Sequence, residues 1–310
     1  MTIYALRRLL LVVPLLIVIS FLTFILNHLS PMNPAEAVLR AQEVPVITDE
    51  LLAQASEEMG FNRPFLERYA DWLGASLRLD FGDSYVTGKP VWSLLGPALL
   101  NTIKLTLVSS LLVILLSIGI GAACALREGR LFDVSARGLA FMLTAMPHFW
   151  LAALLIWLFS VKLDWLPTSG MDGASSYVLP VAVIVIGYAG IYFRVIRSSM
   201  LGQLHDDHVL YARACGLSKG RIVRRVLRNS LQVAVSVLGM AIPIILGSTV
   251  VVENVFAWPG IGSLMVKSIL SRDFPMIQAY VLVLAACFVI CNMAADLVQA
   301  LLSPKVRRSM

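Results

Sequence analysis

Charged residues are scarce in this sequence. Lys, Arg, Asp and Glu make up 14% of its 310 residues, whereas soluble domains carry about 25%. Hydrophobic residues make up 58%, and they occur in long runs rather than in the short alternating blocks of a soluble core. A helix needs about 20 apolar residues to cross the hydrocarbon of a bilayer. The composition therefore excludes an ordinary soluble domain and predicts a polytopic membrane protein.

Cysteine is also rare, and the usual signs of catalysis are missing. The cysteines are Cys124, Cys215, Cys287 and Cys291, and their spacing fits neither a disulfide framework nor a zinc site. The sequence has no glycine-rich loop ending in Lys and Ser or Thr, so ATP hydrolysis by the P-loop route is not expected. No nucleophile–base–acid constellation is recognisable. We therefore predict that the chain is not an enzyme and holds no metal or cofactor.

Six apolar runs define the predicted membrane spans. They cover residues 9–29, 99–126, 138–161, 178–200, 231–252 and 277–301. The first run is longer than the hydrophobic part of a signal peptide, so we interpret it as an uncleaved span. Pro147 is expected to bend the third run. The pattern predicts an all-α protein with six transmembrane helices.

Residues 30–95, between the first two runs, form the one sizeable polar segment. It carries ten acidic and five basic side chains, which fits an extracytoplasmic location. Thr48 is predicted to cap a helix that ends at Gly60, and Pro64 is predicted to open a second helix. The predicted organisation is 1–29, the cytoplasmic N-terminus and first transmembrane helix, then 30–95, the helical extracytoplasmic segment, and then 96–310, a five-helix core with a cytoplasmic loop at 201–230.

Basic residues give the spans a direction. They collect in the loops after the second and fourth runs and in the tail, at Lys305, Arg307 and Arg308. The positive-inside rule places these segments and the N-terminus in the cytoplasm, which requires an even number of spans. The net charge of +6 has the same explanation. Nucleic-acid binding is not expected, because no basic stripe with base-stacking aromatics accompanies the charge.

The loop between the fourth and fifth runs is the most informative stretch. A short helix holding Tyr211, Ala212 and Ala214 and closing at Gly216 would present a small, flat surface, because small residues let another backbone approach closely. Gly216 can take the left-handed conformation that ends one helix before the next begins. Such a projection could transmit force from a cytoplasmic partner into the membrane. The alternative is an ordinary basic loop that only satisfies the topology.

This loop resembles the coupling motif of ABC-importer permeases, in the variant of the dipeptide, oligopeptide and nickel branch. Members of that branch read Tyr-x-x-x-Ala-Arg-Ala-x-Gly-Leu followed by Leu-Arg-Asn-x-Leu. The corresponding residues here are Asp207, Tyr211, Ala212, Arg213, Ala214, Gly216, Leu217, Leu227, Arg228, Asn229 and Leu231. The sequence departs from the pattern at Tyr211, which directly precedes Ala212, and at Gln232, near where proline is common. The resemblance implies that the segment from Asp207 to Leu217 couples the chain to an ATPase.

Two further stretches resemble the same family. Residues 252–262 fit its Glu-x-x-Phe-x-Trp-Pro-Gly-x-Gly signature, and residues 79–84, Leu-Asp-Phe-Gly-Asp-Ser, match a third family stretch. Glu253 is a carboxylate at the outer end of the fifth run, where it either serves as a gate or caps the following turn. His148 is a polar residue at membrane depth and hence a pathway candidate. The candidate pathway or outer-gate residues are Glu253, Asn254, Phe256, Trp258, Pro259, Met240 and His148.

The likeness runs through nearly the whole chain and implies a type I ABC-importer permease fold in the bacterial cytoplasmic membrane. It implies pairing with a second, homologous permease and with membrane lipid around both. Two P-loop ATPases, which would carry the ATP and magnesium, and an extracytoplasmic substrate-binding protein are the other implied partners. ATP-driven rocking of the two permeases would give alternating access.

A resemblance to one group of transporters within this family indicates the substrate. Residues 166–170, 177–180 and 188–194 look like those of the staphylopine-type transporters, which favours nickel or metal–opine (metallophore) complexes. Free di- or oligopeptides remain the alternative. An ion-coupled secondary transporter is a more remote possibility, because such carriers place charged residues near the bilayer midplane and few are present here.

Overall fold

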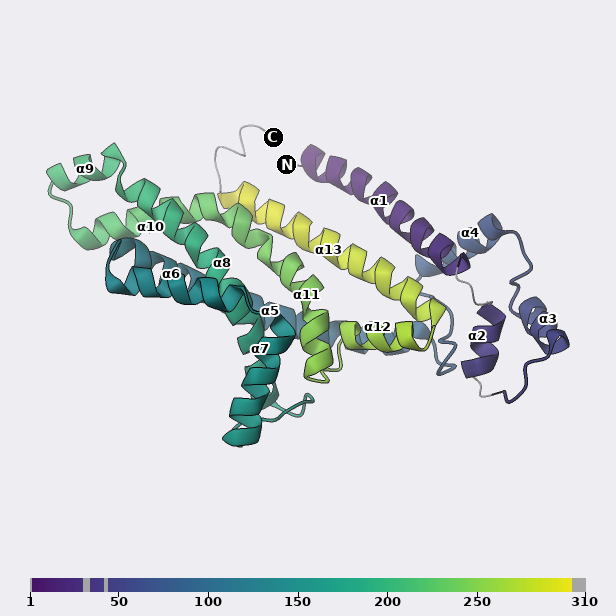
Figure 1. The fold of residues 1–310 in the computed structure, drawn as a ribbon. Helices are drawn as coiled ribbons and strands as arrows, with labels where there is room; N and C mark the ends of the chain where they lie inside the picture. The colour runs from purple at the N-terminus through teal and green to yellow at the C-terminus, as the bar shows by residue number, and fades with distance from the viewer. Residues whose placement is uncertain (1, 30–33, 42–43, 303–310) are drawn as a thin grey trace. The chain divides into compact units, whose positions relative to one another are not determined.

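The computed structural model describes residues 2–29, 34–41 and 44–302. These residues form helices and loops with one isolated β-bridge and no strand, which confirms the all-α prediction (Figure 1). In chain order the helices are α1 (Thr2–His28), α2 (Pro34–Ala41), α3 (Asp49–Glu58), α4 (Phe65–Ser76), α5 (Val91–Leu126), α6 (Leu131–Thr144), α7 (His148–Leu155), η1 (Ile156–Lys162), η2 (Ala174–Tyr177), α8 (Val178–Leu204), α9 (Asp207–Ala214), α10 (Lys219–Gly239), α11 (Ala241–Val255), α12 (Ile261–Leu270) and α13 (Phe274–Leu302).

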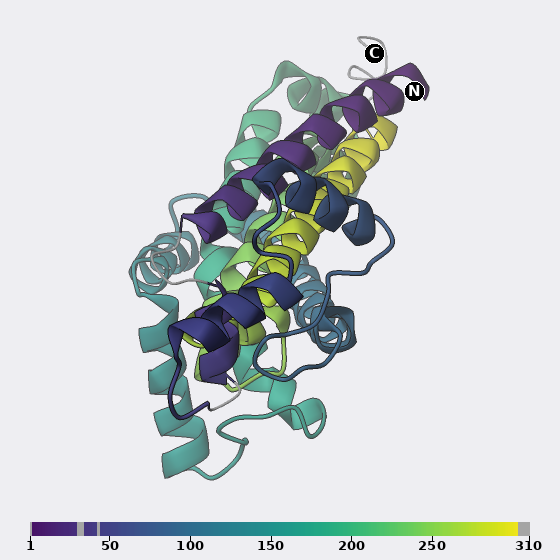
Figure 2. The same ribbon diagram turned by 90° about the vertical axis from the view of Figure 1, so that its right-hand side faces the viewer.

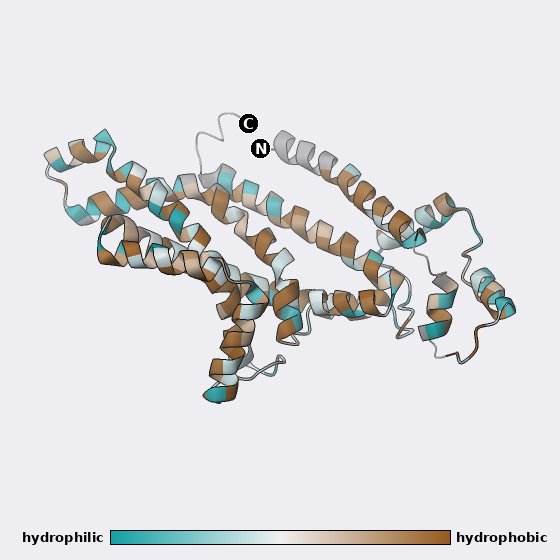
Figure 3. Cartoon of the chain, viewed as in Figure 1, coloured by the Kyte–Doolittle hydropathy of each residue, from teal (hydrophilic) through white to brown (hydrophobic). Residues whose placement is uncertain are grey.

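Fewer than six helices in the described part of the chain meet the length and hydropathy of a membrane span. Among the described residues, four helical stretches are long and apolar enough to cross a membrane: 91–126, 174–204, 237–255 and 274–299. The pair α6 and α7–η1 makes a fifth if it is one broken span, and the apolar part of α1, Val12–His28, is shorter than these. The prediction of six spans is therefore not confirmed. Figure 3 shows the hydrophobic colour along α6, α7 and α13.

The third apolar run is broken rather than bent. Its two halves, Leu131–Thr144 and His148–Lys162, meet at an angle of 103°. Pro147 stands at the break, directly before α7. Proline lacks the N–H that a continuous helix would need there, and it biases the residue before it away from helical geometry. The predicted bend at Pro147 is confirmed, and it divides the run into two separate helices.

The chain divides into two compact units. Unit 1 comprises residues 1–102 and 259–289, and unit 2 comprises residues 103–258 and 290–310. These units follow contacts in space, so they differ from the division at residues 29 and 95 predicted from topology, which stays a prediction. The basic tail at Lys305, Arg307 and Arg308 lies outside the described residues.

In unit 1, aromatic side chains hold α4 against α1 (Figures 1 and 2). Phe24 contacts Phe65, Tyr69 and Trp72 with ring centroids 5.2, 5.5 and 5.9 Å apart. The hydroxyls of Ser20 and Tyr69 are 2.8 Å apart. The pairs with Phe65 and Tyr69 are edge to face, and such pairs stabilise by about 0.5–1.5 kcal/mol beyond area burial. The aromatic residues of α4 therefore serve packing on α1.

Local signals in the polar segment are confirmed. The Thr48 hydroxyl accepts the N–H of Leu51 at 3.3 Å and caps α3. Gly60 has φ +67°, in the left-handed region, and directly follows the end of α3. Pro64 directly precedes α4. The same unit contains a second apolar cluster, in which the start of α5 packs with α12 and the first half of α13.

In unit 2, α8 is the central helix. It contacts α6, α7, α10 and α11, and Figure 1 shows α6 and α10 beside it. One continuous apolar cluster runs from Val209 of α9 through Ile196 of α8 to Trp258 after α11. The coupling segment and residues 252–258 are thus attached to the same core, whereas the motif stretch 79–84 belongs to unit 1.

Candidate functional site

Helix α9 carries the predicted coupling residues and shows two different faces. Val209 and Ala212 are buried, with 2% and 5% of their surface exposed. Leu210 and Tyr211 are 68% and 73% exposed. Asp207, Arg213 and Ala214 are also exposed, and Leu217 is half-buried. The segment therefore presents large apolar side chains outward, whereas Ala212, expected on the contact surface, faces the core.

The end of α9 is a tight left-handed turn at Gly216. Gly216 has φ +76°, and the N–H of Leu217 donates to the carbonyl of Ala212 at 3.1 Å. The N–H of Gly216 donates to the carbonyl of Arg213 at 3.0 Å, completing a Schellman motif. A residue with a Cβ would be strained by about 1–2 kcal/mol in this conformation. The predicted turn is confirmed, and it fixes the direction in which α10 leaves α9.

The buried side of α9 belongs to the core of unit 2. Val209 and Ala212 share an apolar cluster with Met200 of α8 and with Ile222 and Val226 of α10. Interiors of this kind are closely packed and transmit displacement instead of absorbing it. A push on the exposed face of α9 would therefore move α8 and α10 with it.

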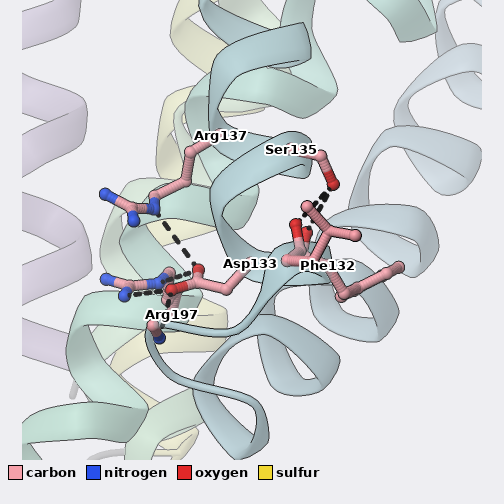
Figure 4. A network of polar contacts seen from close by, with 7 residues as sticks. Phe132, Asp133, Ser135, Arg137 and Arg197 are labelled. Atoms are coloured by element: carbon pink, nitrogen blue, oxygen red, sulfur yellow. Dashed lines mark hydrogen bonds and ion pairs between the residues drawn. The ribbon is translucent and has the colours of Figure 1, made fainter.

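An ion pair that the sequence analysis did not identify joins α6 to α8 (Figure 4). Asp133 is fully buried, and Arg197 donates to both of its oxygens, from Nε to Oδ1 at 2.6 Å and from Nη2 to Oδ2 at 2.7 Å. Arg137 Nε lies 3.3 Å from Oδ1, and the N–H of Gly129 donates to Oδ2 at 3.0 Å. The signal in the sequence was Asp133, an acid placed between Arg130 and Arg137 in the basic stretch 127–137, which topology alone does not explain.

His148 lies at the break between α6 and α7, packed on the backbone of α8. A Cβ added to Gly187 would stand 2.2 Å from Nε2 of His148, so only glycine admits the imidazole there. The ring also lies 5.3 Å from that of Tyr188. The half-buried His148 thus forms a close contact between two elements at the broken span.

The turn after α11 holds the outer candidates in unit 2. Glu253 is fully buried, and its backbone carbonyl accepts the N–H of Trp258 at 2.8 Å. Ala257 between them has φ +47°, the left-handed conformation at which α11 ends. Trp258 is fully buried and meets Tyr177 edge to face at 4.6 Å. The carbonyl of Phe256 accepts the N–H of Gly170 at 2.9 Å, so the turn is fixed from several sides.

Asn254 belongs to the same turn, where its carbonyl accepts the N–H of Ala257 at 3.4 Å, and Pro259 directly follows it, whereas Met240 lies far from it. Asn254 is exposed and donates from Nδ2 to the Val250 carbonyl at 2.7 Å. Met240 is 58% exposed and stands at the opposite end of α11 from Glu253, about 20 Å away along the helix axis. Pro259 belongs to unit 1, where its carbonyl accepts from Asn101 Nδ2 at 3.0 Å.

The third motif stretch is fixed by an acid that sequence reasoning missed. In unit 1, Ser84 Oγ donates to Oδ2 of Asp273 at 2.5 Å, and the N–H of Tyr85 donates to Oδ1 at 3.1 Å. Asp273 is 3% exposed and directly precedes α13. Burial raises the pKa of Tyr85 to about 12, with Arg68 opposing and Asp273 adding to the shift. The loop before α5 is therefore tied to the start of α13.

No group of three or more His, Cys, Asp or Glu side chains that could hold a metal ion occurs among the described residues. The candidate functional site consists of three features of unit 2. It comprises an exposed helix mounted on the core, a broken span, and a buried turn after α11.

Two families of transport proteins match this sequence. Residues 116–308 match the family described as "Binding-protein-dependent transport system inner membrane component". Residues 1–106 match the N-terminal component of such transport systems. Both matches together cover most of the chain.

Curated relatives extend over the whole length. The "Metal-staphylopine import system permease protein CntB" of Staphylococcus aureus (strain NCTC 8325 / PS 47) is 50% identical over 304 residues, 98% of each chain. The "Oligopeptide transport system permease protein AppB" of Bacillus subtilis (strain 168) is 34% identical over 318 residues, 99% of each. The "Glutathione transport system permease protein GsiC" of Salmonella typhimurium is 34% identical over 305 residues, 98% of each.

Two solved structures share the fold. A chain of the MetNI methionine ABC transporter in an inward-facing conformation superposes with a TM-score of 0.57 at 16% identity, covering 68% of this chain and 96% of that one. An amino acid ABC transporter determined with histidines gives a TM-score of 0.51 at 17% identity, covering 67% and 92%. At such identities the likeness concerns the fold alone.

Proposed function

Because the chain belongs to the family of binding-protein-dependent transport system inner membrane components and is an ABC-importer permease, we propose that it forms half of the pathway through which metal–opine complexes, or nickel itself, enter the cell. The observation that carries the substrate assignment is the 50% identity to a metal-staphylopine permease over 98% of both chains. Identity to the oligopeptide and glutathione permeases is 34% over a similar length. Free peptides are therefore the second candidate.

The proposed partners follow from the family to which the chain belongs. An ABC-importer permease works with ATPase and substrate-binding subunits, and it is a transport component rather than an enzyme. In the assembly proposed here, a second, homologous permease completes the pathway and two P-loop ATPases carry the ATP and magnesium. An extracytoplasmic binding protein delivers the substrate. This arrangement is consistent with the absence of a phosphate-binding loop in the sequence.

Helix α9 is the proposed docking point for one ATPase. Its exposed Leu210 and Tyr211 supply an apolar surface that a docked partner would remove from water. Aromatic anchors of this kind dominate the energetics of many interfaces. Its buried Val209 and Ala212 carry motion into α8 and α10. ATP-driven closure of the ATPases would then rock the permease pair between inward- and outward-open states.

The turn after α11 is the proposed outer gate. A buried carboxylate at a membrane helix end is costly and is retained where it has a partner or a function. The backbone carbonyl of Glu253 closes the turn with Trp258, and its buried carboxylate is the group that we propose as the gate. Asn254, Phe256, Pro259, Met240 and His148 remain proposed pathway residues.

The substrate proposal can be tested on the substrate-binding protein of the same importer. We expect that protein to bind a nickel–opine complex far more tightly than di- or tetrapeptides, as measured by titration calorimetry. The metal-free opine serves as the control for chelation. Preference for peptides would assign the importer to the peptide branch and leave the permease assignment intact.

A further inference from the structure

Unit 2 contains a cavity of about 1320 Å³, and its lining includes Leu227, Arg228 and Leu231 from the second part of the coupling motif. Its walls come from helices α5, α10, α11 and α13. Helix α5 contributes Leu107, Ile114 and Ile118, and α13 contributes Ile290, Ala294 and Val298. Small-molecule sites enclose about 300–1,000 Å³, so this cavity has room for a larger ligand.

Four arginines line one end of the cavity. Arg221, Arg224, Arg225 and Arg228 follow one another at helical spacing, so they share a face of α10. All four are exposed, and in the described part of the chain no carboxylate lies within ion-pair distance of any of them. No acid is among the lining residues either. The first turn of α10 contains no acid, and a helix N-terminus adds positive potential of its own. This end of the cavity therefore attracts an anion.

The rest of the cavity is apolar. Among the described residues that line it, the polar side chains besides the arginines are Gln232 and the weakly polar Cys291. The wall of α10 continues from Arg228 to Gly239, where a Cβ would lie 2.9 Å from that of Ala295 in α13. This stretch measures about 16 Å along the helix, close to half of the roughly 30 Å hydrocarbon core. The apolar part thus matches the depth of one leaflet.

We propose that this cavity binds an acidic phospholipid, with its phosphate at the four arginines and an acyl chain along α10 and α13. Guanidinium groups bind phosphate oxygens in bidentate fashion, and basic pockets between membrane helices bind acidic head groups. A hydrophilic chelate or peptide would find few partners on the apolar walls. The lipid would neutralise the arginine cluster beside the coupling segment, so its head group would stabilise the position of α10. The proposal requires a membrane location but does not depend on which substrate is transported.

The test uses the complete importer, purified and reconstituted in phosphatidylcholine nanodiscs with or without phosphatidylglycerol. Native mass spectrometry counts the lipids that stay bound to each complex. We expect retained phosphatidylglycerol, not phosphatidylcholine, in the wild type and a several-fold loss in the Arg224→Gln/Arg228→Gln variant. The matched control is Lys219→Gln/Arg130→Gln, which removes the same charge from exposed positions outside the cavity. Equal loss in both variants would contradict the proposal.

A second variant distinguishes a lipid whose acyl chain lies in the cavity from a lipid that only its head-group charge attracts to the arginines. Ala294→Phe fills the apolar wall and leaves every arginine in place, so a lipid with its chain in the cavity should be lost here too. Unchanged phosphatidylglycerol in Ala294→Phe would mean that only the head group is attracted, which overturns the seating. Cys291 also lines the cavity and provides a native attachment point. A zero-length crosslink from Cys291 to the second permease, with no retained lipid, would show that protein fills the space instead.

Discussion

Gly187 and His148 interlock where the third apolar run breaks. The imidazole occupies the space that any side chain on Gly187 would need, since a Cβ there would lie 2.2 Å from Nε2. Neither residue has a close substitute, because glycine alone leaves the room and the broken span places the ring against it. This contact fixes α7 to α8 and makes the break a defined joint rather than a loose connection.

Gly187→Ala is expected to destabilise the protein by about 1–3 kcal/mol, because the added methyl group forces the imidazole or α8 to shift. The measurement is thermal unfolding of the purified protein in detergent. Gly202→Ala is the matched control, since it lies in the same helix with open space around it, and should be neutral or slightly stabilising. Adding His148→Ala to Gly187→Ala should restore part of the loss. Additive effects of the two changes would show that the residues do not interlock.

Gly216→Val is expected to uncouple transport while the protein still inserts. The left-handed φ of +76° penalises a β-branched residue, so the turn would reopen and α9 would lose its fixed direction. The assays are substrate uptake and ATP hydrolysis by the reconstituted complex. Gly220→Ala, in the first turn of α10 and without a left-handed φ, should leave both activities near the wild-type level. Wild-type uptake by Gly216→Val would refute the coupling role.

Asp133→Asn is expected to cost about 3 kcal/mol of stability, because the half-buried guanidinium of Arg197 would lose its counter-ion. Arg137→Gln should cost less than about 1 kcal/mol, since Arg137 is 43% exposed and its contact with Asp133 is longer. Chemical or thermal unfolding in detergent ranks the two. If Asp133→Asn were as mild as Arg137→Gln, the pair would not lock α6 to α8.

Ser84→Ala is expected to loosen the loop before α5. The buried carboxylate of Asp273 would lose its 2.5 Å hydrogen bond, at a cost of about 1–3 kcal/mol. Hydrogen–deuterium exchange should rise in residues 79–90 without a change in unit 2. Ser93→Ala is the control, because its hydroxyl bonds a neighbouring carbonyl in an exposed setting. Unaltered exchange in the loop would mean that Asp273 does not fix it.

Glu253→Gln preserves the shape of a buried side chain and removes its charge. If the carboxylate gates the pathway, the variant should change substrate-stimulated ATP hydrolysis and uptake while the turn, closed by backbone bonds, remains intact. Stability should be measured in parallel to separate the two roles. Wild-type values for both activities would leave Glu253 as a structural residue.

Features that depend on a few neighbouring residues, such as helix caps and left-handed turns, could be predicted from the sequence. Thr48, Gly60 and Gly216 were identified because caps and left-handed turns are encoded within a few residues. Ala212 was expected on the exposed face, yet it lies three residues after the buried Val209, so the helical period places both inward. Its position could have been predicted from that spacing.

Contacts between distant residues could not be predicted in this way. Asp133 and Arg197 are 64 residues apart, and Ser84 and Asp273 are 189 apart. Their pairing depends on how helices pack, which hydropathy does not determine. The number of spans is underdetermined for a related reason, since apolar length alone does not distinguish a straight span from the broken pair at Pro147.

Transport by the complete importer tests the central claim most directly. Proteoliposomes containing both permeases and ATPases would be supplied with the binding protein and radioactive nickel, either as its opine complex or as the free ion, alongside a labelled peptide. The account predicts ATP-dependent uptake of the metal, with the Gly216→Val complex inactive and little uptake of peptide. Peptide uptake without metal uptake, or uptake that continues without ATP, would contradict it.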